Sequence, residues 1–267
     1  MLVPVKQGQA PDLGDHKAKR PKGLPDREEL KELTDEAQEK LGQLQNVFYA
    51  DRRFALLVVV QGRDAAGKDG VIRRVFDACN PQGVQVTGFK VPTDLERSHD
   101  FLWRVHAAVP AHGQIGIFNR SHYEDVLVVR VHKLAPAAVW KKRYDQINSF
   151  EEMLALNNVI ILKFFLHISR EEQREQLIER LEDPTKNWKF RVGDLEDRKL
   201  WNEYTKAYQD ALSKCSTKWA PWYVVPANDK RARNYLVTQT IVEKLESLQL
   251  KYPPASMEVL ALKDSIK

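Results

Sequence analysis

The stretch FALLVVVQGRDAAGKDG, residues 54–70, decides the fold. Its apolar run Phe54–Val60 is typical of a strand that is buried on both faces, as in a parallel sheet covered by helices. The pattern GxxxxGK follows from Gly62 to Lys68 and leads into a predicted helix. In such a P loop the backbone N–H groups surround a phosphate, and the lysine reaches the terminal phosphates. We therefore predict phosphate or nucleotide contacts from Gly62, Arg63, Ala65, Ala66, Gly67, Lys68, Asp69 and Gly70.

Two acids distinguish this P loop from the ordinary one. The residue after the lysine is normally Ser or Thr, whose hydroxyl binds Mg²⁺, but here it is Asp69, and Asp64 lies inside the loop. Carboxylates beside a polyanion repel it unless metal ions lie between them. Either acid could instead cap the helix that begins here. The functional interpretation is a site that handles more metal and more phosphate than usual.

Strands and helices alternate along the rest of the chain. This alternation predicts an α/β, three-layer fold with a parallel central sheet. We expect one domain at 27–250, which starts with an amphipathic helix after Asp26, between a flexible arm at 1–26 and a tail at 251–267. The further strands are expected at 84–86, 115–118, 159–166 and 222–225, and the helices at about 70–79, 95–108, 139–157, 170–181, 194–214 and 231–250.

A second polar segment, IGIFNRSHYED at 115–125, ends one of these strands. In open α/β sheets ligands bind at the carboxyl ends of the strands, so this segment should face the P loop. Arg120 could grip a transferring phosphoryl group, and Glu124 or Asp125 could complete a metal shell. Glu124 could alternatively be an acid in the first turn of a helix.

Other basic residues could reach the same place. Lys90 follows the second strand, and the insertion at 182–194 is typical of the tip of a helical hairpin, where a mobile lid at about 170–200 would sit. A basic tip could close over a phosphate and exclude water, although a solvated charged tip would have the same composition. Its cations around Trp188 are Arg180, Lys186, Lys189 and Arg191.

Two groups of residues have a plain structural alternative. The segment Asp229–Arg233 is either a patch that faces phosphate or ordinary surface, and the sequence favours neither. His99 and His106 lie on one predicted helix, but no third ligand or zinc spacing accompanies them, so we expect them to pack on the helix face.

Composition sets outer limits on the function. The 267 residues include 42 Lys+Arg and 37 Asp+Glu, a net charge of +5, and 43% of them are hydrophobic, as in a globular domain. The longest strictly apolar run, Phe54–Val60, is far below the roughly 18 residues of a membrane span, and no secretory signal is evident, so we expect no membrane partner. Cys79 and Cys215 are solitary, which favours buried thiols and a cytoplasmic location. A surplus of +5 is too small to indicate nucleic acid by itself.

Six segments in chain order form a recognisable set: GRDAAGKDG (62–70), TGFKVPT (87–93), HDFLWR (99–104), IFNRSHYEDV (117–126), LEDPTKNWKF (181–190) and APWYVVPAND (220–229). Together they resemble the polyphosphate kinase 2 family. This resemblance implies a P-loop kinase fold similar to that of thymidylate kinase, with a helical lid, and phosphoryl transfer between inorganic polyphosphate and AMP, ADP or ATP with Mg²⁺ or Mn²⁺. It also implies metal and phosphate roles for Asp64, Lys68 and Asp69, phosphate contacts for Arg120, Arg180 and Lys189, and a homo-oligomer, dimer or tetramer.

The chain departs from that family pattern at one motif. Many members have Asp where this chain has Asn119, and Asn where it has Glu124, so the acid is displaced by five positions. The exchange resembles the subgroup that phosphorylates both nucleoside mono- and diphosphates. It makes Glu124, rather than Asn119, the candidate metal ligand beside Asp64 and Asp69.

Two rival functions stay open at this point. An ATP-dependent nucleoside monophosphate kinase would share the fold and the lid, but it would be expected to keep Ser or Thr at position 69. A nucleic-acid-binding P-loop protein would use the basic arm, but it would leave Asp64 and Asp69 unexplained.

Overall fold

A five-stranded parallel sheet forms the centre of the molecule. The computed structural model describes residues 1–262 and 266, and its sheet has the strand order β2-β3-β1-β4-β5. Each pair of neighbouring strands runs parallel, so the predicted α/β class is confirmed. The strands are β1 (Ala55–Gly62), β2 (Val84–Gly88), β3 (Ile115–Asn119), β4 (Val159–His167) and β5 (Trp222–Pro226).

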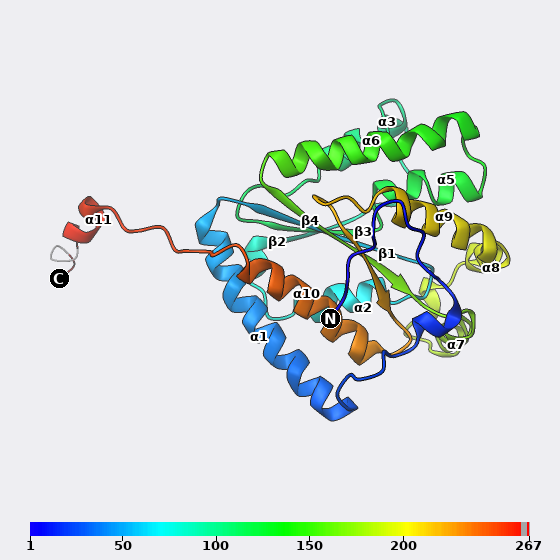
Figure 1. The fold of residues 1–267 in the computed structure, drawn as a ribbon, viewed down its shortest axis with the longest axis horizontal. Coiled ribbons are helices and arrows are strands. Elements are labelled where there is room, and N and C mark those ends of the chain that lie inside the picture. Colours follow the sequence, from blue (N-terminus) through cyan, green and yellow to red (C-terminus); the bar gives the residue numbers. More distant parts are fainter. Residues whose placement is uncertain (263–265, 267) are drawn as a thin grey trace.

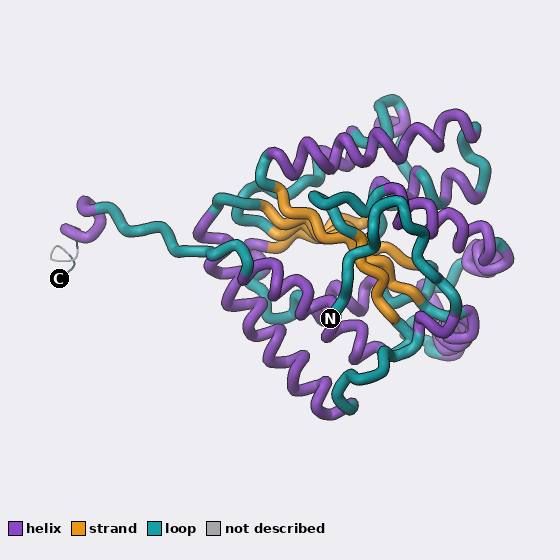
Figure 2. Tube along the Cα trace, viewed as in Figure 1, coloured by secondary structure: helices purple, strands orange, loops and turns teal. Residues whose placement is uncertain are grey.

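Helices cover both faces of this sheet and complete three layers (Figures 1 and 2). On one face lie α1 (Arg27–Asp51), α2 (Lys68–Val75) and α10 (Lys230–Glu246). On the other lie α5 (Val128–Val131), α6 (Ala137–Leu156) and α9 (Trp201–Lys214). All eight residues of β1 are buried, because alternate side chains enter the two cores. The continuous apolar run in the sequence is thus explained by cover on both faces.

Two predicted helices are each divided in the structure. The expected helix at 95–108 is wrong as a single element, because it forms α3 (Asp94–Arg97) and α4 (Trp103–His106). Between them the Asp100 carboxylate accepts a hydrogen bond from the Leu102 backbone N–H, a local turn that competes with helix. The expected helix at 194–214 is also divided, at Leu200, into α8 (Val192–Lys199) and α9.

The shorter elements complete the chain. A hairpin of α7 (Arg170–Glu182) and α8, with a short 3₁₀ turn at Asn187–Lys189 between them, occupies the predicted insertion, and we call it the α7–α8 hairpin. Further 3₁₀ turns lie at Asp15–Ala18, Pro81–Gly83 and His122–Asp125. The helix predicted after Asp26 is confirmed, since the Asp26 carboxylate accepts from two backbone N–H groups of α1.

The N-terminal arm is ordered against the domain, in contrast to the flexible arm expected from its prolines. The backbone N–H of Val5 donates to the carbonyl of Trp222 in β5 at 2.8 Å, and that of Gly8 donates to Ser213 in α9 at 2.8 Å. Leu13 and Ala18 are buried. The physical reason is that β5 and α9 offer hydrogen-bond partners and apolar contacts that the arm's composition does not reveal.

The C-terminal end of the described chain leaves the body of the molecule (Figure 1). The residues described beyond position 250 are exposed, including the short helix α11 (Met257–Ala261). The rest of the predicted tail, residues 263–265 and 267, lies outside the described residues. Among the helices that the structure describes, none has the length and apolar character needed to cross a membrane.

Candidate active site

The P loop lies at the carboxyl end of β1, beside the segment that follows β3. Val60 of β1 is in register with Asn119 of β3, and the backbone N–H of Arg120 donates to the Val60 carbonyl at 3.1 Å. The loop requires glycine at position 67, where φ is +86° and an added Cβ would lie 2.2 Å from Nη1 of Arg233. The parallel sheet therefore brings the two predicted segments together, as the sequence indicated.

Lys68 points back into its own loop. Its ammonium Nζ donates to the carbonyl oxygens of Gly62 at 2.8 Å and Arg63 at 3.1 Å. Burial, reinforced by the nearby charge of Arg120, lowers the pKa of Lys68 to about 8. The lysine is thus held at the centre of the loop, with a charge that a bound phosphate would stabilise.

Arg120 lies between Asp64 and Glu124, two of the three acids predicted as metal ligands. Its guanidinium forms ion pairs with Asp64 at 2.5 Å and with Glu124 at 3.4 Å. Burial opposes the charge on Arg120, but the two carboxylates outweigh that effect and raise its pKa. Burial likewise favours protonation of Asp64, but Lys68 and Arg120 together lower its pKa, so this acid is ionised near neutral pH.

The backbone at Arg120 is strained. Its φ of +63° is in the left-handed region, which side chains other than glycine rarely adopt. Such strain persists only where surrounding contacts hold it, and it occurs preferentially at functional sites. It turns the guanidinium toward the P loop immediately after a buried strand.

Asp69 connects three parts of the site. Its carboxylate accepts a hydrogen bond from Nδ2 of Asn119 at 2.7 Å and forms an ion pair with Nζ of Lys189 at 3.5 Å. Burial raises its pKa, but the contacts with Asn119 and Lys189 reverse the effect and lower it. Lys189 comes from the α7–α8 hairpin, so the hairpin tip reaches the P loop as the sequence predicted. Asn119, the position that departs from the family pattern, donates its hydrogen bond to the acid of the P loop, Asp69.

The remaining cations of the hairpin differ in what they contact. Arg180 forms an ion pair with Asp194 at 3.3 Å inside the hairpin, and its charge is close enough to help lower the pKa of Asp64. Lys186 pairs with Glu179 and Asp183, each at 2.8 Å, within the hairpin itself. Arg180 therefore lies near the site, whereas Lys186 is engaged in the hairpin.

The side chain of Arg63 is directed to α9, so the phosphate contact predicted for this residue stays a prediction for its backbone N–H. It is 7% exposed, stacks on the Trp201 ring at 3.7 Å, and donates to the Trp201 carbonyl at 3.1 Å. Because α9 provides an aromatic face and two acceptors, the guanidinium turns away from the loop. Arg63 contributes its backbone to the P loop, while its side chain anchors the loop to α9.

Lys90 and Asp125 are not drawn into this cluster. Lys90 is exposed, and within the described part of the chain no ion pair or hydrogen bond joins its side chain to the P loop. Asp125 forms an ion pair with Arg143 of α6 at 2.8 Å, so of the two acids left open by the sequence, Glu124 is the one beside Arg120.

The acids fit a metal that is bound together with phosphate. No group of three or more His, Cys, Asp or Glu side chains that could hold an ion occurs in the residues described, so Asp64, Asp69 and Glu124 do not form one protein cage. Mg²⁺ typically binds one or two carboxylates and completes its shell with water and substrate phosphates. Asp64 and Glu124, both hard oxygen donors on either side of Arg120, match that mode.

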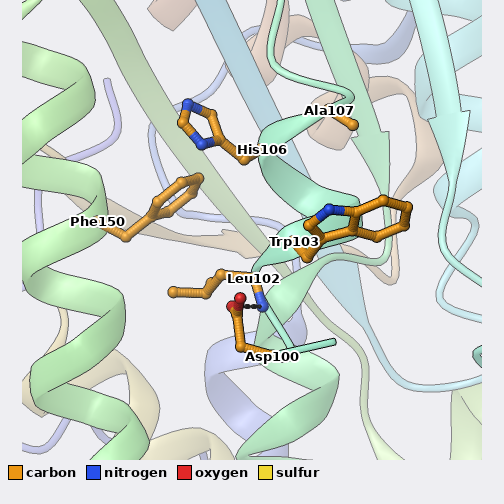
Figure 3. Close-up of a pocket in the computed structure, with 6 residues that line it drawn as sticks. All are labelled: Asp100, Leu102, Trp103, His106, Ala107 and Phe150. Carbon is orange, nitrogen blue, oxygen red and sulfur yellow. Dashed lines mark hydrogen bonds between the residues drawn. The ribbon is translucent and has the colours of Figure 1, made fainter. Parts of the chain in front are cut away.

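An aromatic and apolar wall borders the charged cluster. A small pocket is lined by the P loop, by Arg120 and Glu124, and by Gln173 and Asp197 of the α7–α8 hairpin. Its aromatic and apolar lining residues are Leu127, Val128, Tyr204 and Tyr208. A larger hollow of about 380 Å³ lies between α4 and α6, formed by different elements from the P loop (Figure 3). There His106 packs edge-on against Phe150, and His99 stacks on Trp103, which agrees with the packing role expected for both histidines.

Sequence reasoning missed Glu151 and Lys163, and it left the role of the segment that holds Arg233 open. Arg233 is buried and donates to the Ala66 carbonyl of the P loop at 3.3 Å, so at this residue the segment 229–233 is not ordinary surface. Lys163 and Glu151 form a buried ion pair of 2.5 Å behind the Arg120 segment, residues 119–125. A signal for Lys163 was available, because it is the one charged residue in the apolar run VIILKFFL at 159–166.

Known proteins match this chain over nearly its whole length. The family model of Polyphosphate kinase 2 matches residues 24–253. An AMP/ADP-polyphosphate phosphotransferase of Meiothermus ruber is 57% identical over 214 residues, covering 80% of each chain. An ADP-polyphosphate phosphotransferase of Rhodopseudomonas palustris is 45% identical and covers 93% of this chain and 90% of that protein. The crystal structure of polyphosphate kinase 2 from Arthrobacter aurescens TC1 superposes with a TM-score of 0.93 at 42% identity, covering 98% of this chain and 94% of that one. The sheet, the P loop and these matches together show that the chain belongs to the polyphosphate kinase 2 family.

Proposed function

We propose that this protein transfers phosphoryl groups from inorganic polyphosphate to AMP and ADP, forming ADP and ATP in a reversible reaction. The observation that carries the proposal is the cluster of Lys68, Arg120 and Lys189 with Asp64, Asp69 and Glu124 around one P loop. Its charges suit a polyanion with bound metal, and relatives named for both AMP and ADP acceptors support the choice of acceptors.

Phosphoryl transfer depends on positioning and charge stabilisation rather than on a covalent intermediate with the protein. An oxygen of the acceptor phosphate attacks the terminal phosphorus of polyphosphate, and the bridging P–O bond breaks as the shortened chain leaves. The P-loop N–H groups and Lys68 hold the terminal phosphates, and Arg120 stabilises the equatorial oxygens. The acceptor phosphate is already ionised near neutral pH, so the step needs no general base.

Asp64 and Glu124 would hold Mg²⁺ or Mn²⁺ together with the phosphates. A bound divalent ion would neutralise part of the negative charge on the phosphate oxygens. In this structure the two carboxylates engage Arg120, so the same acids hold the arginine beside the P loop. A further ion pair joins Asp69 of the P loop to Lys189 at the tip of the α7–α8 hairpin. This hairpin would act as the lid.

The donor distinguishes this proposal from an ATP-dependent monophosphate kinase. The protein is incubated with AMP, polyphosphate and Mg²⁺ without ATP, and in parallel with AMP, ATP and Mg²⁺ without polyphosphate. We expect ADP in the first reaction, and Lys68→Ala should abolish it. ADP only in the second reaction would show that ATP is the donor.

The role of Glu124 has its own test. Glu124→Ala should lower turnover of AMP and raise the Mg²⁺ concentration needed for half-maximal rate, because one of the two carboxylates beside Arg120 is lost. Asp125→Ala is a matched control, since that acid pairs with Arg143 instead. Unchanged activity on AMP in Glu124→Ala would exclude a metal role for this acid.

The assembly and location of the protein are part of the same proposal. By resemblance to the family we propose a dimer or tetramer, which sedimentation or light scattering would measure. A cytoplasmic location agrees with the two free cysteines, of which Cys215 is buried and Cys79 partly buried.

A further inference from the structure

A fully buried network of charged and polar side chains lies behind the Arg120 segment. Lys163, in the middle of β4, donates from Nζ to Oε2 of Glu151 at 2.5 Å, to the Tyr123 hydroxyl at 2.7 Å and to the Cys215 carbonyl at 2.7 Å. All three hydrogen atoms of its ammonium group thus have an acceptor. The side chains of Lys163 and Glu151 are 0% exposed.

The second oxygen of Glu151 holds two further residues. Its Oε1 accepts from the Tyr123 hydroxyl at 2.9 Å and contacts Nε2 of His122 at 3.1 Å. His122 and Tyr123 are also buried. We call the four side chains of His122, Tyr123, Glu151 and Lys163 the buried network; it joins β4 and α6 to the Arg120 segment.

Stability alone does not explain this network. Removing two charges from water costs more than their mutual attraction usually returns, and well-packed apolar residues in place of a buried ion pair are often neutral or stabilising. Lys163 lies in a central strand whose other residues from 159 to 166 are apolar. A charged pair at this position therefore calls for a role other than packing.

The network's place in the chain points to that role. His122 and Tyr123 follow Arg120 after a single residue, Ser121, whose own hydroxyl accepts a hydrogen bond from Gln61 of β1 at 3.1 Å. The same short turn carries Arg120, with its φ of +63°, and Glu124. A strained backbone of this kind must be held by its surroundings, and the buried network is what holds the residues directly after it.

We propose that Glu151 and Lys163 are positioning residues, which act through His122 and Tyr123 to hold Arg120 and Glu124 against the P loop. The inference rests on the proposed function, in that Arg120 must act on the transferring phosphoryl group. Because Arg120 would act mainly in the transition state, loosening its segment should lower kcat more than it changes KM for polyphosphate.

The gentlest test is Tyr123→Phe, which removes one hydroxyl and keeps the ring. Tyr144→Phe is the matched control, because Tyr144 is also buried and its hydroxyl bonds a charged side chain, Arg130, whereas no hydrogen bond in the described structure joins that hydroxyl to the Arg120 segment. We expect kcat to fall about tenfold in Tyr123→Phe, with KM for polyphosphate within about twofold, and to change less than twofold in Tyr144→Phe. Equal kcat values in the two variants would overturn the proposal.

A second test separates positioning from general damage to the fold. The pair Glu151→Gln with Lys163→Met, or Tyr123→Phe alone if the pair does not fold, is combined with Arg120→Ala. If the network acts through Arg120, its loss should cost little further activity once Arg120 is absent. An equal fold-loss of kcat in both backgrounds would contradict positioning of Arg120. Wild-type turnover of AMP with polyphosphate tests the proposed function separately, so the two failures are distinguishable.

Discussion

At the scale of single residues, the charge of Lys68 should govern how the enzyme responds to pH. Burial lowers the pKa of Lys68 to about 8, so the ammonium is charged below that pH and neutral above it. Polyphosphate binding requires the charged form. KM for polyphosphate should therefore rise as the pH increases through 8, and binding above pH 8 should take up a proton.

The measurement is a pH profile of KM for polyphosphate from pH 6.5 to 9.5, a range chosen to span that pKa of about 8. Lys68→Arg is the control, because a guanidinium keeps its charge throughout this range. Its KM should lack the alkaline rise even if its activity is lower. The same rise in both proteins would assign the titration to another group.

Arg120 should be the most sensitive single position for the chemical step. It is the half-buried cation between Asp64 and Glu124, and an arginine that stabilises a transferring phosphoryl group contributes about 10³-fold or more to the rate. Arg120→Ala should lower kcat by about that factor, and Arg120→Lys should recover only part of it, because a lysine lacks the planar fork of donors. Steady-state kinetics with AMP measure kcat for both variants. Full activity in Arg120→Lys would show that the planar guanidinium of Arg120 is not needed.

Residue identities at the P loop could be predicted from the sequence, but side-chain directions could not. GxxxxGK fixes the path of the backbone, and Lys68 lies where that pattern requires. The direction of Arg63 depends on Trp201, which is 138 residues away in the chain. The contact between Lys163 and Glu151 could not be predicted either, because an ion pair between a strand and a helix can be identified only when the packing of the two elements is known.

At the scale of elements, the α7–α8 hairpin should contribute to donor binding through Lys189. Lys189→Ala removes its ion pair with Asp69 and the cation that would meet polyphosphate. KM for polyphosphate should rise by about two- to fivefold, the size expected of a partly exposed charge, with a smaller change in KM for AMP. Lys186→Ala is the control from the same tip, because Lys186 pairs within the hairpin; an equal effect of both would indicate only general attraction.

The N-terminal arm should stabilise the domain. Deletion of residues 1–22 removes buried Leu13 and Ala18 and the hydrogen bonds to β5 and α9, but it keeps the Asp26 cap of α1. We expect Tm to fall by about 4 to 8 °C, which corresponds to about 2 kcal/mol in a protein of this size. Truncation before Met257, where the described residues are exposed, should change Tm by less than about 1 °C. Equal Tm values for the arm deletion and the intact protein would show that the arm contributes no stability.

Whether an element could be predicted from the sequence depends on what stabilises it. Strands and long helices with a continuous or periodic apolar pattern were predictable, because that pattern is their main source of stability. The arm was not, since its order comes from backbone hydrogen bonds to β5 and α9 that no local pattern encodes. The division at Asp100 depends on one side-chain hydrogen bond, which competes with a helix that the apolar spacing alone would favour.

At the scale of the whole molecule, a net charge of +5 gives little indication of the site. The parallel sheet gathers lysine, arginine and carboxylate side chains at the carboxyl ends of β1 and β3, and the α7–α8 hairpin adds Lys189 from the other side. In the resulting ion pairs, phosphate can take the place of a carboxylate beside a cation, and metal can take the place of a cation beside a carboxylate. This arrangement, rather than the overall charge, is what suits the protein to a chain of phosphates.

The most direct test is a time course of AMP, ADP and ATP with polyphosphate as the only phosphoryl donor. Starting from AMP, we predict that ADP forms first and ATP follows, that ADP alone also yields ATP, and that Lys68→Ala forms neither product. If AMP and ADP stay unchanged while polyphosphate and Mg²⁺ are present, polyphosphate is not the donor and the account is wrong.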